Sequence, residues 1–394
     1  MKTINADVVI CGGGLSGLIC SLALSRYGIS VCTIEKSRHN IQQTKDTRST
    51  AYLLPSINFL IKTGIWKYLS KDINPLRVLS IVNSKNGYPF NQVLNETQFN
   101  AKEISKEYFG YNISNYETKK ILMKLVKRDK LINFIDDEII SVENFKELLT
   151  INLKNKSMIK TKLLIGADGR NSFIRNYYNI KTQITDIDQK AVTFIIQHKE
   201  SHKNISYEIY DLGGPFTTVP LKSKEEKKSA VIWVNDSIKI DKLLSLKKFE
   251  LQSEINKRSC NKLGEISVIS DLQSSNVSTQ LAEKFVDHRM ILIGEAAHAL
   301  PPIGAQGLNL TIKDISVICD LIKKYSTSIG SNEMVAEFNL KRLIDVKTRT
   351  TTVNILNKVS YSNNVITRKA RNLGLKLLQE VKPIKYLLMK FGLG

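Results

Sequence analysis

The sequence predicts an α/β fold in which a parallel sheet is interrupted by an inserted antiparallel sheet and followed by a C-terminal helical segment. Three observations lead to this prediction. Short apolar runs, typical of buried parallel strands, end in glycine-containing turns near residues 12, 166 and 294. Residues 182–276 instead alternate apolar and polar side chains, as antiparallel strands do. Helical spacing of apolar residues returns towards the C-terminal end.

The first apolar strand, Val8–Cys11, leads into a turn whose glycines have the G-x-G-x-x-G spacing: Gly12, Gly14 and Gly17. In a strand–turn–helix unit, these glycines permit a tight turn, the approach of a pyrophosphate and close packing of the helix on the strand. The helix should run from Leu15 to about Tyr27, and a second strand should end at Glu35. Glu35 could then accept hydrogen bonds from an adenosine ribose. The stretch predicts a dinucleotide site, with a glycine-rich loop of another α/β protein as the alternative.

Length and composition narrow the class of protein. The 394 residues can form two or three domains, and a hydrophobic content of 42% is ordinary for a globular protein. The five cysteines show no metal-ligand spacing, so we expect reduced thiols in a cytoplasmic protein and no metal site. No apolar stretch approaches the ~20 residues of a membrane span.

The formal net charge of +21 favours an anionic partner. The basic residues are nevertheless spread along the whole chain, so we expect no binding of nucleic acid. Attraction to the anionic inner face of a bacterial membrane is the stronger alternative.

The region after Glu35 begins with a polar loop that reaches Arg48, where a phosphate contact and an ordinary surface arginine are equally good interpretations. The other elements expected before the second motif are a helix over 51–69 interrupted by Pro55, a strand-like and turn-rich stretch over 76–99, a helix over 116–127, and short strands near 131–135, 139–143 and 148–153.

The second motif follows another buried strand, 163–166. Asp168-Gly169 forms a turn there, and a helix should begin with Ser172 and Arg175 one turn apart. Ligands of open α/β sheets bind at the carboxyl ends of the parallel strands, so this turn is a candidate part of the site.

The third motif follows the strand Met290–Ile293. It contains Gly294-Glu295, two prolines at 301 and 302, and the glycines Gly304 and Gly307, which open a helix ending near Tyr325. These glycines would let backbone N–H groups approach a ligand, and the helix dipole would favour negative charge there by about 0.3–1 kcal/mol. His298 could act as a base, but no partner for a catalytic triad is in view, so we expect packing or a loop hydrogen bond.

Within the inserted sheet, Gly213–Phe216 forms a tight turn before Val219. A loop over a ligand and a plain hairpin turn are equally good interpretations of this stretch.

The three motifs, in this order, resemble those of the FAD-dependent class A aromatic monooxygenases, the para-hydroxybenzoate hydroxylase superfamily. The stretch Gly-Glu-Ala-Ala-His-x-x-Pro-Pro-Ile-Gly-Ala-Gln-Gly-Leu-Asn from Gly294 is most similar to the bacterial ubiquinone-biosynthesis hydroxylases. The resemblance spans the whole chain. It implies a Rossmann-like FAD-binding domain (1–75, 100–181 and 277–335), an inserted antiparallel β-sheet substrate domain (76–99 and 182–276) and a C-terminal helical segment (336–394).

The resemblance also implies site residues. Those expected to bind the cofactor are Gly12, Gly14, Gly17, Glu35, Arg48, Asn115, Asp168, Glu295, Gly304, Gly307, Leu308 and Asn309. Those expected near the substrate pocket are Gly214, Pro215, Phe216, His298 and Pro301. Two positions depart from the family pattern: Glu295 stands where most relatives have aspartate, and glutamine is commoner at the position of Asn115.

The implied chemistry needs no catalytic side chain. NAD(P)H or another donor would reduce FAD, and O2 would form a flavin C4a-hydroperoxide that hydroxylates a phenolic ring, here a polyprenylated phenol of ubiquinone biosynthesis. The protein would supply a dry pocket. The alternatives are an FAD enzyme of the same fold acting on a soluble aromatic or as a prenyl reductase, and a non-catalytic flavin-fold subunit of a biosynthetic complex.

The stretch 365–394 combines apolar and basic residues, with helical spacing on both sides of Pro383. We expect Pro383 to break or kink the helix. The apolar face either packs on the enzyme's own flavin domain or docks on an anionic membrane or a quinone-biosynthesis complex.

Overall fold

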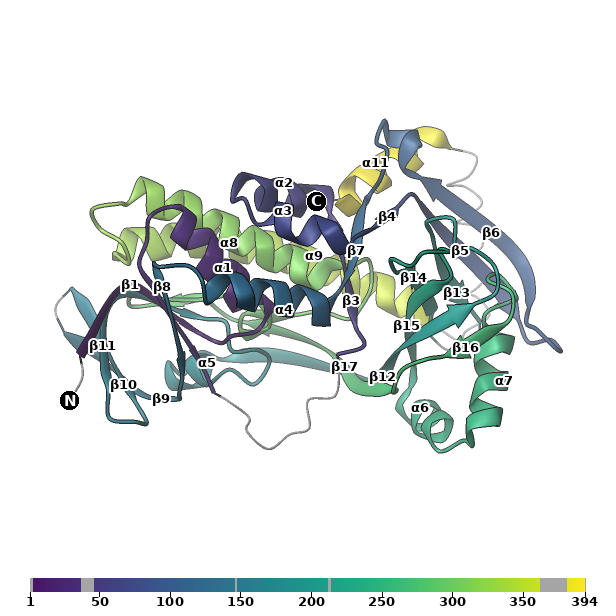
Figure 1. Ribbon diagram of the computed structural model, residues 1–394, viewed down its shortest axis with the longest axis horizontal. Coiled ribbons are helices and arrows are strands. Elements are labelled where there is room, and N and C mark those ends of the chain that lie inside the picture. The colour runs from purple at the N-terminus through teal and green to yellow at the C-terminus, as the bar shows by residue number, and fades with distance from the viewer. Residues whose placement is uncertain (1–2, 37–45, 146, 212–213, 362–380, 394) are drawn as a thin grey trace.

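The computed structural model describes residues 3–36, 46–145, 147–211, 214–361 and 381–393 (Figure 1). It confirms the predicted α/β fold. A largely parallel sheet with its helices occupies one end of the molecule, and a second, mainly antiparallel sheet occupies the other (Figure 1).

The first sheet is parallel at its centre and has the strand order β18-β19-β11-β1-β2-β8. Strand β1 pairs in parallel with β11 and β2, and β9, β10 and β18 add antiparallel pairs. Its strands are β1 (Thr3–Cys11), β2 (Val31–Glu35), β8 (Ile132–Asp136), β9 (Ile139–Phe145), β10 (Leu148–Leu153), β11 (Met158–Gly166), β18 (Val286–Asp287) and β19 (Met290–Leu292). The central strands are apolar on both faces, because both faces are covered by protein.

Helices α1 (Leu15–Arg26), α4 (Asn115–Val126) and α8 (Gln306–Lys324) lie side by side over this sheet (Figure 1). Helix α1 is buried along most of its length, because α4 and α8 pack on the sides that the sheet leaves open. The long helix α9 (Asn332–Tyr361) packs on α8, and the short helix α5 (Phe173–Tyr177) follows β11. All four predicted buried strands and the helices at α1, α4, α5 and α8 are confirmed.

A small sheet joins the two ends of the molecule. It consists of β3 (Ser49–Leu53), β7 (Gly110–Ser114) and β4 (Asn74–Leu76), and it is accompanied by α2 (Leu54–Lys62), α3 (Trp66–Leu69) and the 3-10 turn η1 (Ser70–Asp72). The predicted helix over 51–69 is therefore wrong at its start, because residues 51–53 pair with β7. Pro55 stands in the first turn of α2 instead of interrupting it, since the first turn of a helix needs no N–H donor.

The second sheet has the order β20-β17-β12-β15-β14-β13-β5-β6, with β16 beside β12. All its pairs are antiparallel except that of β5 with β13. Its strands are β5 (Val78–Lys85), β6 (Gln92–Asn100), β12 (Thr182–His198), β13 (Ile205–Tyr210), β14 (Phe216–Pro220), β15 (Lys228–Asp236), β16 (Ile266–Val268), β17 (Gln273–Ala282) and β20 (His298–Ala299). The predicted strand-rich stretches 76–99 and 182–276 thus come together in one sheet.

Two helices within this region were not expected. Helices α6 (Ser237–Leu244) and α7 (Lys248–Arg258) cover one face of the second sheet, where Ile240 and Ile255 join the apolar cluster around Trp233. Helix α7 is highly polar and buries only Ile255 and Arg258. The sequence therefore shows no continuous apolar stripe from which to predict it.

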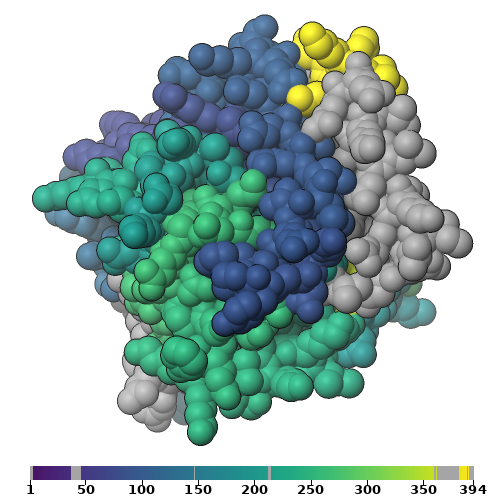
Figure 2. All heavy atoms as spheres, turned by 90° about the vertical axis from the view of Figure 1, so that its right-hand side faces the viewer, coloured from purple at the N-terminus to yellow at the C-terminus, as the bar shows by residue number. Residues whose placement is uncertain are grey.

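The last described helix is α11 (Lys382–Leu393), and Pro383 stands in its first turn, so it does not kink a longer helix within the described residues. Lys385 pairs with Glu103 at 2.6 Å, and Met389 packs with Phe99 and Ile104, beside the 3-10 turn η2 (Ala101–Ile104) (Figure 2). Residues 365–380 of the predicted tail lie outside the described residues. No helix of the described chain is long and apolar enough to cross a membrane.

Candidate dinucleotide site

In the glycine loop after β1, close backbone contacts require Gly12 and Gly17, whereas Gly14 faces open space. A Cβ at Gly12 (φ +115°) would lie 2.3 Å from the Ala167 carbonyl oxygen, and one at Gly17 would lie 1.8 Å from the Gly12 carbonyl oxygen. A Cβ at Gly14 would meet no atom within 4 Å. Gly14 is the N-cap of α1, so this open space lies at the positive end of a helix dipole, which suits a pyrophosphate.

Glu35 lies beside this loop at the end of β2. The Gly13 N–H donates a hydrogen bond to the Glu35 carboxylate, and the Gly12 N–H donates to the Ile34 carbonyl at 2.8 Å. The carboxylate is therefore held at the edge of the loop, the position expected for a ribose acceptor.

The three sequence motifs meet at the carboxyl ends of adjacent strands. The Ala167 N–H donates to the Cys11 carbonyl at 2.8 Å, which joins the first two motifs. The Arg175 guanidinium donates to the carbonyls of Arg170 and Ala296, both at 3.0 Å, which joins the second and third. Since ligands of such sheets bind at this edge, the convergence supports a single site.

Asp168 binds the start of α5, whose N-cap is Ser172. Its carboxylate accepts hydrogen bonds from the Ser172 hydroxyl at 2.6 Å and the Ile174 N–H at 3.1 Å. Burial raises the pKa of Asp168 above its ordinary value, and these hydrogen bonds oppose the rise. Burial also raises the pKa of the neighbouring Cys11 thiol well above its ordinary value, so this cysteine is a poor nucleophile.

Arg48 directly precedes β3, and its side chain is held by Asp46, two residues earlier in the chain. Its guanidinium donates to both carboxylate oxygens of Asp46, at 2.9 and 2.8 Å, and Asp46 thereby raises the pKa of Arg48. The charge of Glu295 raises it further. Asn115 lies next to Arg48, because its N–H donates to the Arg48 carbonyl at 3.0 Å. Arg48, Asn115 and Glu295 therefore belong to one region, although they come from three elements.

The third motif ends at the start of α8. Gly304 (φ +63°) and Ala305 (φ +55°) have left-handed backbones that turn the chain into the helix, and a Cβ at Gly307 would meet no atom within 4 Å. Glu295 is exposed, Leu308 is half-buried, and the Gly307 backbone borders the open space. The glycines thus leave room for a ligand at a second helix N-terminus.

The Asn309 side chain has hydrogen-bond partners within the protein. Its amide donates to the Ala51 carbonyl at 2.8 Å and to the Ala305 carbonyl at 2.6 Å, and its oxygen accepts the Leu53 N–H at 2.9 Å. The side chain therefore holds β3 against α8 and is already engaged by protein groups.

The expected pocket residues lie in two places, and several are packed in the core. Phe216 is fully buried, with its ring 5.4 Å from that of Trp233, and the Gly214 carbonyl accepts a hydrogen bond from Arg258 at 2.8 Å. Pro215 and Pro301 are also buried. The buried His298 imidazole packs beside Phe285 and contacts the Asp314 carboxylate at 2.7 Å, so its partner stands on helix α8 and not in the loop.

The sequence interpretation missed Thr47 and Asp314. The Thr47 hydroxyl contacts the Thr193 hydroxyl at 3.1 Å and donates to the Gln273 side chain at 3.1 Å, which ties the Arg48 segment to the second sheet. Asp314 binds the third motif from α8. A signal for it was present in the sequence, because Asp314 stands on the apolar stripe between Leu310 and Ile318, where a charge requires a buried partner.

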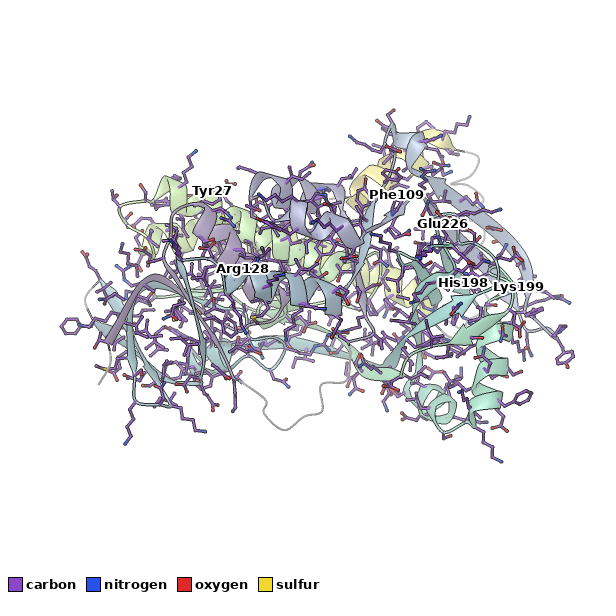
Figure 3. The ribbon with its side chains drawn as sticks, viewed as in Figure 1. Tyr27, Phe109, Arg128, His198, Lys199 and Glu226 are labelled. Atoms are coloured by element: carbon purple, nitrogen blue, oxygen red, sulfur yellow. The ribbon has the colours of Figure 1, made fainter. Side chains whose placement is uncertain are left out.

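Another buried histidine, His198, lies at the outer end of the second sheet near Glu226 (Figure 3). His198 contacts the Glu200 carbonyl at 2.6 Å and the Ser229 hydroxyl at 3.0 Å, and His202 lies beside it. Burial lowers the pKa of both. These contacts support the β12–β13 turn, and no group of three metal-ligating side chains is found among the described residues.

The glycine loop, the acidic end of β2 and the polar turns after β11 and β19 define an α/β protein that binds a dinucleotide. A family model described as an FAD binding domain matches residues 5–349. The chain belongs to this family, the class A flavin monooxygenases, and is an FAD-dependent monooxygenase that uses O2 and NAD(P)H or another electron donor.

Relatives of known activity match almost the whole chain. The chain is 26% identical over 396 residues to the ubiquinone hydroxylase UbiL of Rhodospirillum rubrum, covering 99% of this chain and 90% of the relative. It is 23% identical over 397 residues to the 3-demethoxyubiquinol 3-hydroxylase of Escherichia coli, covering 98% of each.

Solved structures confirm the fold. The p-nitrophenol 4-monooxygenase PnpA of Pseudomonas putida has a TM-score of 0.81 at 16% identity, covering 100% of this chain and 99% of that one. HpxO of Klebsiella pneumoniae, in complex with FAD and uric acid, has a TM-score of 0.78 at 14% identity, covering 99% and 96%.

Proposed function

We propose that this enzyme hydroxylates the aromatic ring of a polyprenylated phenol in ubiquinone biosynthesis. The observation that carries the proposal is the similarity of almost the entire chain to a ubiquinone hydroxylase and to a 3-demethoxyubiquinol 3-hydroxylase. The similarity includes both sheets, and so both the cofactor site and the region expected to bind the substrate.

The residues around the glycine loop fit FAD. We propose that the open space at Gly14 takes the pyrophosphate and that Glu35 binds the adenosine ribose. Glu295 would bind the ribityl chain, and the N-terminus of α8 at Gly304 and Gly307 would face the flavin pyrimidine. Arg48, Asn115, Asp168 and Leu308 would complete the binding region, whereas Asn309 would act mainly by holding β3.

The roles proposed for the parts of the chain correspond to the two sheets, except that β20 and the end of β17 belong to the second sheet. Residues 1–75, 100–181 and 277–335 would bind FAD, residues 76–99 and 182–276 would bind the substrate, and 336–394 would support both. FAD supplies the oxygen chemistry, and the side chains orient the substrate and exclude water. Thr47, which contacts β12 and precedes Arg48, would keep the two parts in register.

Oxygen uptake by the purified enzyme tests the substrate. With FAD, NAD(P)H and a short-chain polyprenylated phenol, we expect oxygen consumption to give hydroxylated product in near-equal amount and little peroxide. The matched control is the same ring without its prenyl tail. Efficient coupling with the tail-less ring alone would favour the second candidate, a hydroxylase of soluble aromatics.

We also propose that the C-terminal end contacts an anionic membrane or the biosynthetic complex that delivers the substrate. Ile384 and Leu387 of α11 are 50% and 65% exposed, and basic residues flank them. Sedimentation with anionic vesicles should recover the full chain at low salt, less of it at high salt, and less of a chain lacking residues 365–394. Equal recovery of both chains would contradict this role.

A further inference from the structure

A buried charged cluster lies directly behind the third motif. Asp314 of α8 is 1% exposed, and its carboxylate contacts groups from three other parts of the chain. It accepts hydrogen bonds from the Gly294 N–H at 3.2 Å and from Arg342 Nε at 2.7 Å, and it lies 2.7 Å from His298 Nε2. Asp314 therefore connects α8 and α9 to the turn that precedes Glu295.

The cluster keeps this carboxylate charged. Burial alone would raise the pKa of Asp314, but His298 and Arg342 lower it below its ordinary value. Arg342 is itself 1% exposed and also pairs with Asp345. Partial burial of Asp345 would raise its pKa, but the charge of Arg342 outweighs this effect and lowers the pKa to about 2. Lys313 and Arg349 also pair with Asp345, at 3.1 and 3.3 Å.

A stabilising role alone does not account well for this arrangement. Apolar residues of similar volume often replace a buried ion pair without loss of stability, because removing two charges from water is costly. The Asp314 carboxylate also has a use that an apolar residue could not fill, since it binds a backbone N–H within a cofactor motif.

That N–H belongs to a turn with little freedom. Gly294 has φ +58°, and a Cβ there would lie 3.0 Å from Thr311 Oγ1 and 3.1 Å from Ser16 Oγ. The turn is thus enclosed by α8 and α1, and its first N–H, that of Gly294, is held by Asp314. The exposed Glu295 follows Gly294 directly in the chain.

We propose that Asp314 is a positioning residue for FAD, which orients Glu295 by fixing the Gly294 turn, while His298 and Arg342 hold the carboxylate in place. The inference rests on the ribityl contact proposed above for Glu295.

The test replaces Asp314 by leucine and Arg342 by methionine in one double variant. Removing both charges avoids leaving either one buried without a partner, and Asp345 retains Lys313. FAD affinity is measured by fluorescence titration of the apoprotein, apoprotein stability by thermal melting, and cofactor geometry by visible circular dichroism of the bound flavin. We expect the Kd for FAD to rise about tenfold, equivalent to about 1.4 kcal/mol, with a changed flavin dichroism.

Asp345→Asn is the matched control, because it alters the outer end of the cluster and leaves the Asp314–Gly294 contact in place. It should change the melting temperature while the Kd stays within about twofold. If the double variant does not fold, His298→Phe removes one partner of Asp314 and should weaken FAD binding, and His298→Gln, which retains an N–H donor, should restore it.

The outcomes distinguish the role of Asp314 from the ribityl contact of Glu295 on which it rests. An unchanged Kd and flavin dichroism in the folded double variant, together with weaker binding in Glu295→Ala, would overturn the role of Asp314 alone. If the double variant does not fold, equal FAD affinity of His298→Phe and the parent protein would likewise overturn the role of Asp314. Unchanged affinity in Glu295→Ala would instead remove the Glu295 assignment on which the inference rests.

Discussion

Replacing Gly14 by valine should abolish FAD binding while leaving the protein folded. Gly14 has an ordinary extended backbone, and a Cβ there meets no protein atom within 4 Å, so the apoprotein should tolerate the new side chain. The branched side chain would instead occupy the space at the N-terminus of α1 where the pyrophosphate must approach the backbone. Flavin absorbance after purification and fluorescence titration with FAD measure the loss, and thermal melting of the apoprotein checks the fold.

Gly17→Ala is the informative contrast. Its Cβ would lie 1.8 Å from the Gly12 carbonyl oxygen, so we expect a fall of about 3 kcal/mol or more in the free energy of unfolding, at the upper end for overpacking. Helix propensity alone would favour alanine by about 1 kcal/mol.

Full FAD occupancy in the Gly14→Val protein would show that the pyrophosphate binds elsewhere.

Replacing Glu295 by alanine should weaken FAD binding by about 1.5–3 kcal/mol, the usual loss for a hydrogen bond to a charged group. This corresponds to a rise in Kd of roughly 10- to 150-fold. Glu295 is exposed, so apoprotein stability should hardly change. Fluorescence titration of the apoprotein with FAD measures the effect.

Glu295→Asp is the control, because it shortens the side chain by one methylene and keeps the carboxylate. We expect its affinity to lie close to that of the parent protein. If Glu295→Ala binds FAD as tightly as the parent, the carboxylate points away from the cofactor and the ribityl contact is wrong.

The local sequence carried enough information for the nucleotide-binding half of the fold. Strand β1, helix α1 and strand β2 each show the apolar pattern of their class, and glycines with a fixed spacing separate them. The three motifs predicted FAD, which the family match confirms. Such signals are readable because they depend on near neighbours along the chain.

Other elements depended on distant partners. Residues 51–53 have a pattern compatible with a helix, but pairing with β7 makes them a strand. Helix α7 has too few apolar residues to be predicted, and it is stabilised by the sheet that it covers. In both places tertiary contacts outweigh weak local preferences.

The candidate site divides in the same way. The sequence by itself determined where the loop lacks side chains, because Gly12, Gly14 and Gly17 act through the missing Cβ, and the tertiary structure showed that only Gly14 of these three faces open space. Only the tertiary structure decided the directions of the larger side chains: Phe216 packs under α6 and α7, and Asn309 binds β3. The cluster of Asp314, His298 and Arg342 likewise exists only once α8, β20 and α9 meet, since a buried carboxylate is stable only where folding brings its partners to it.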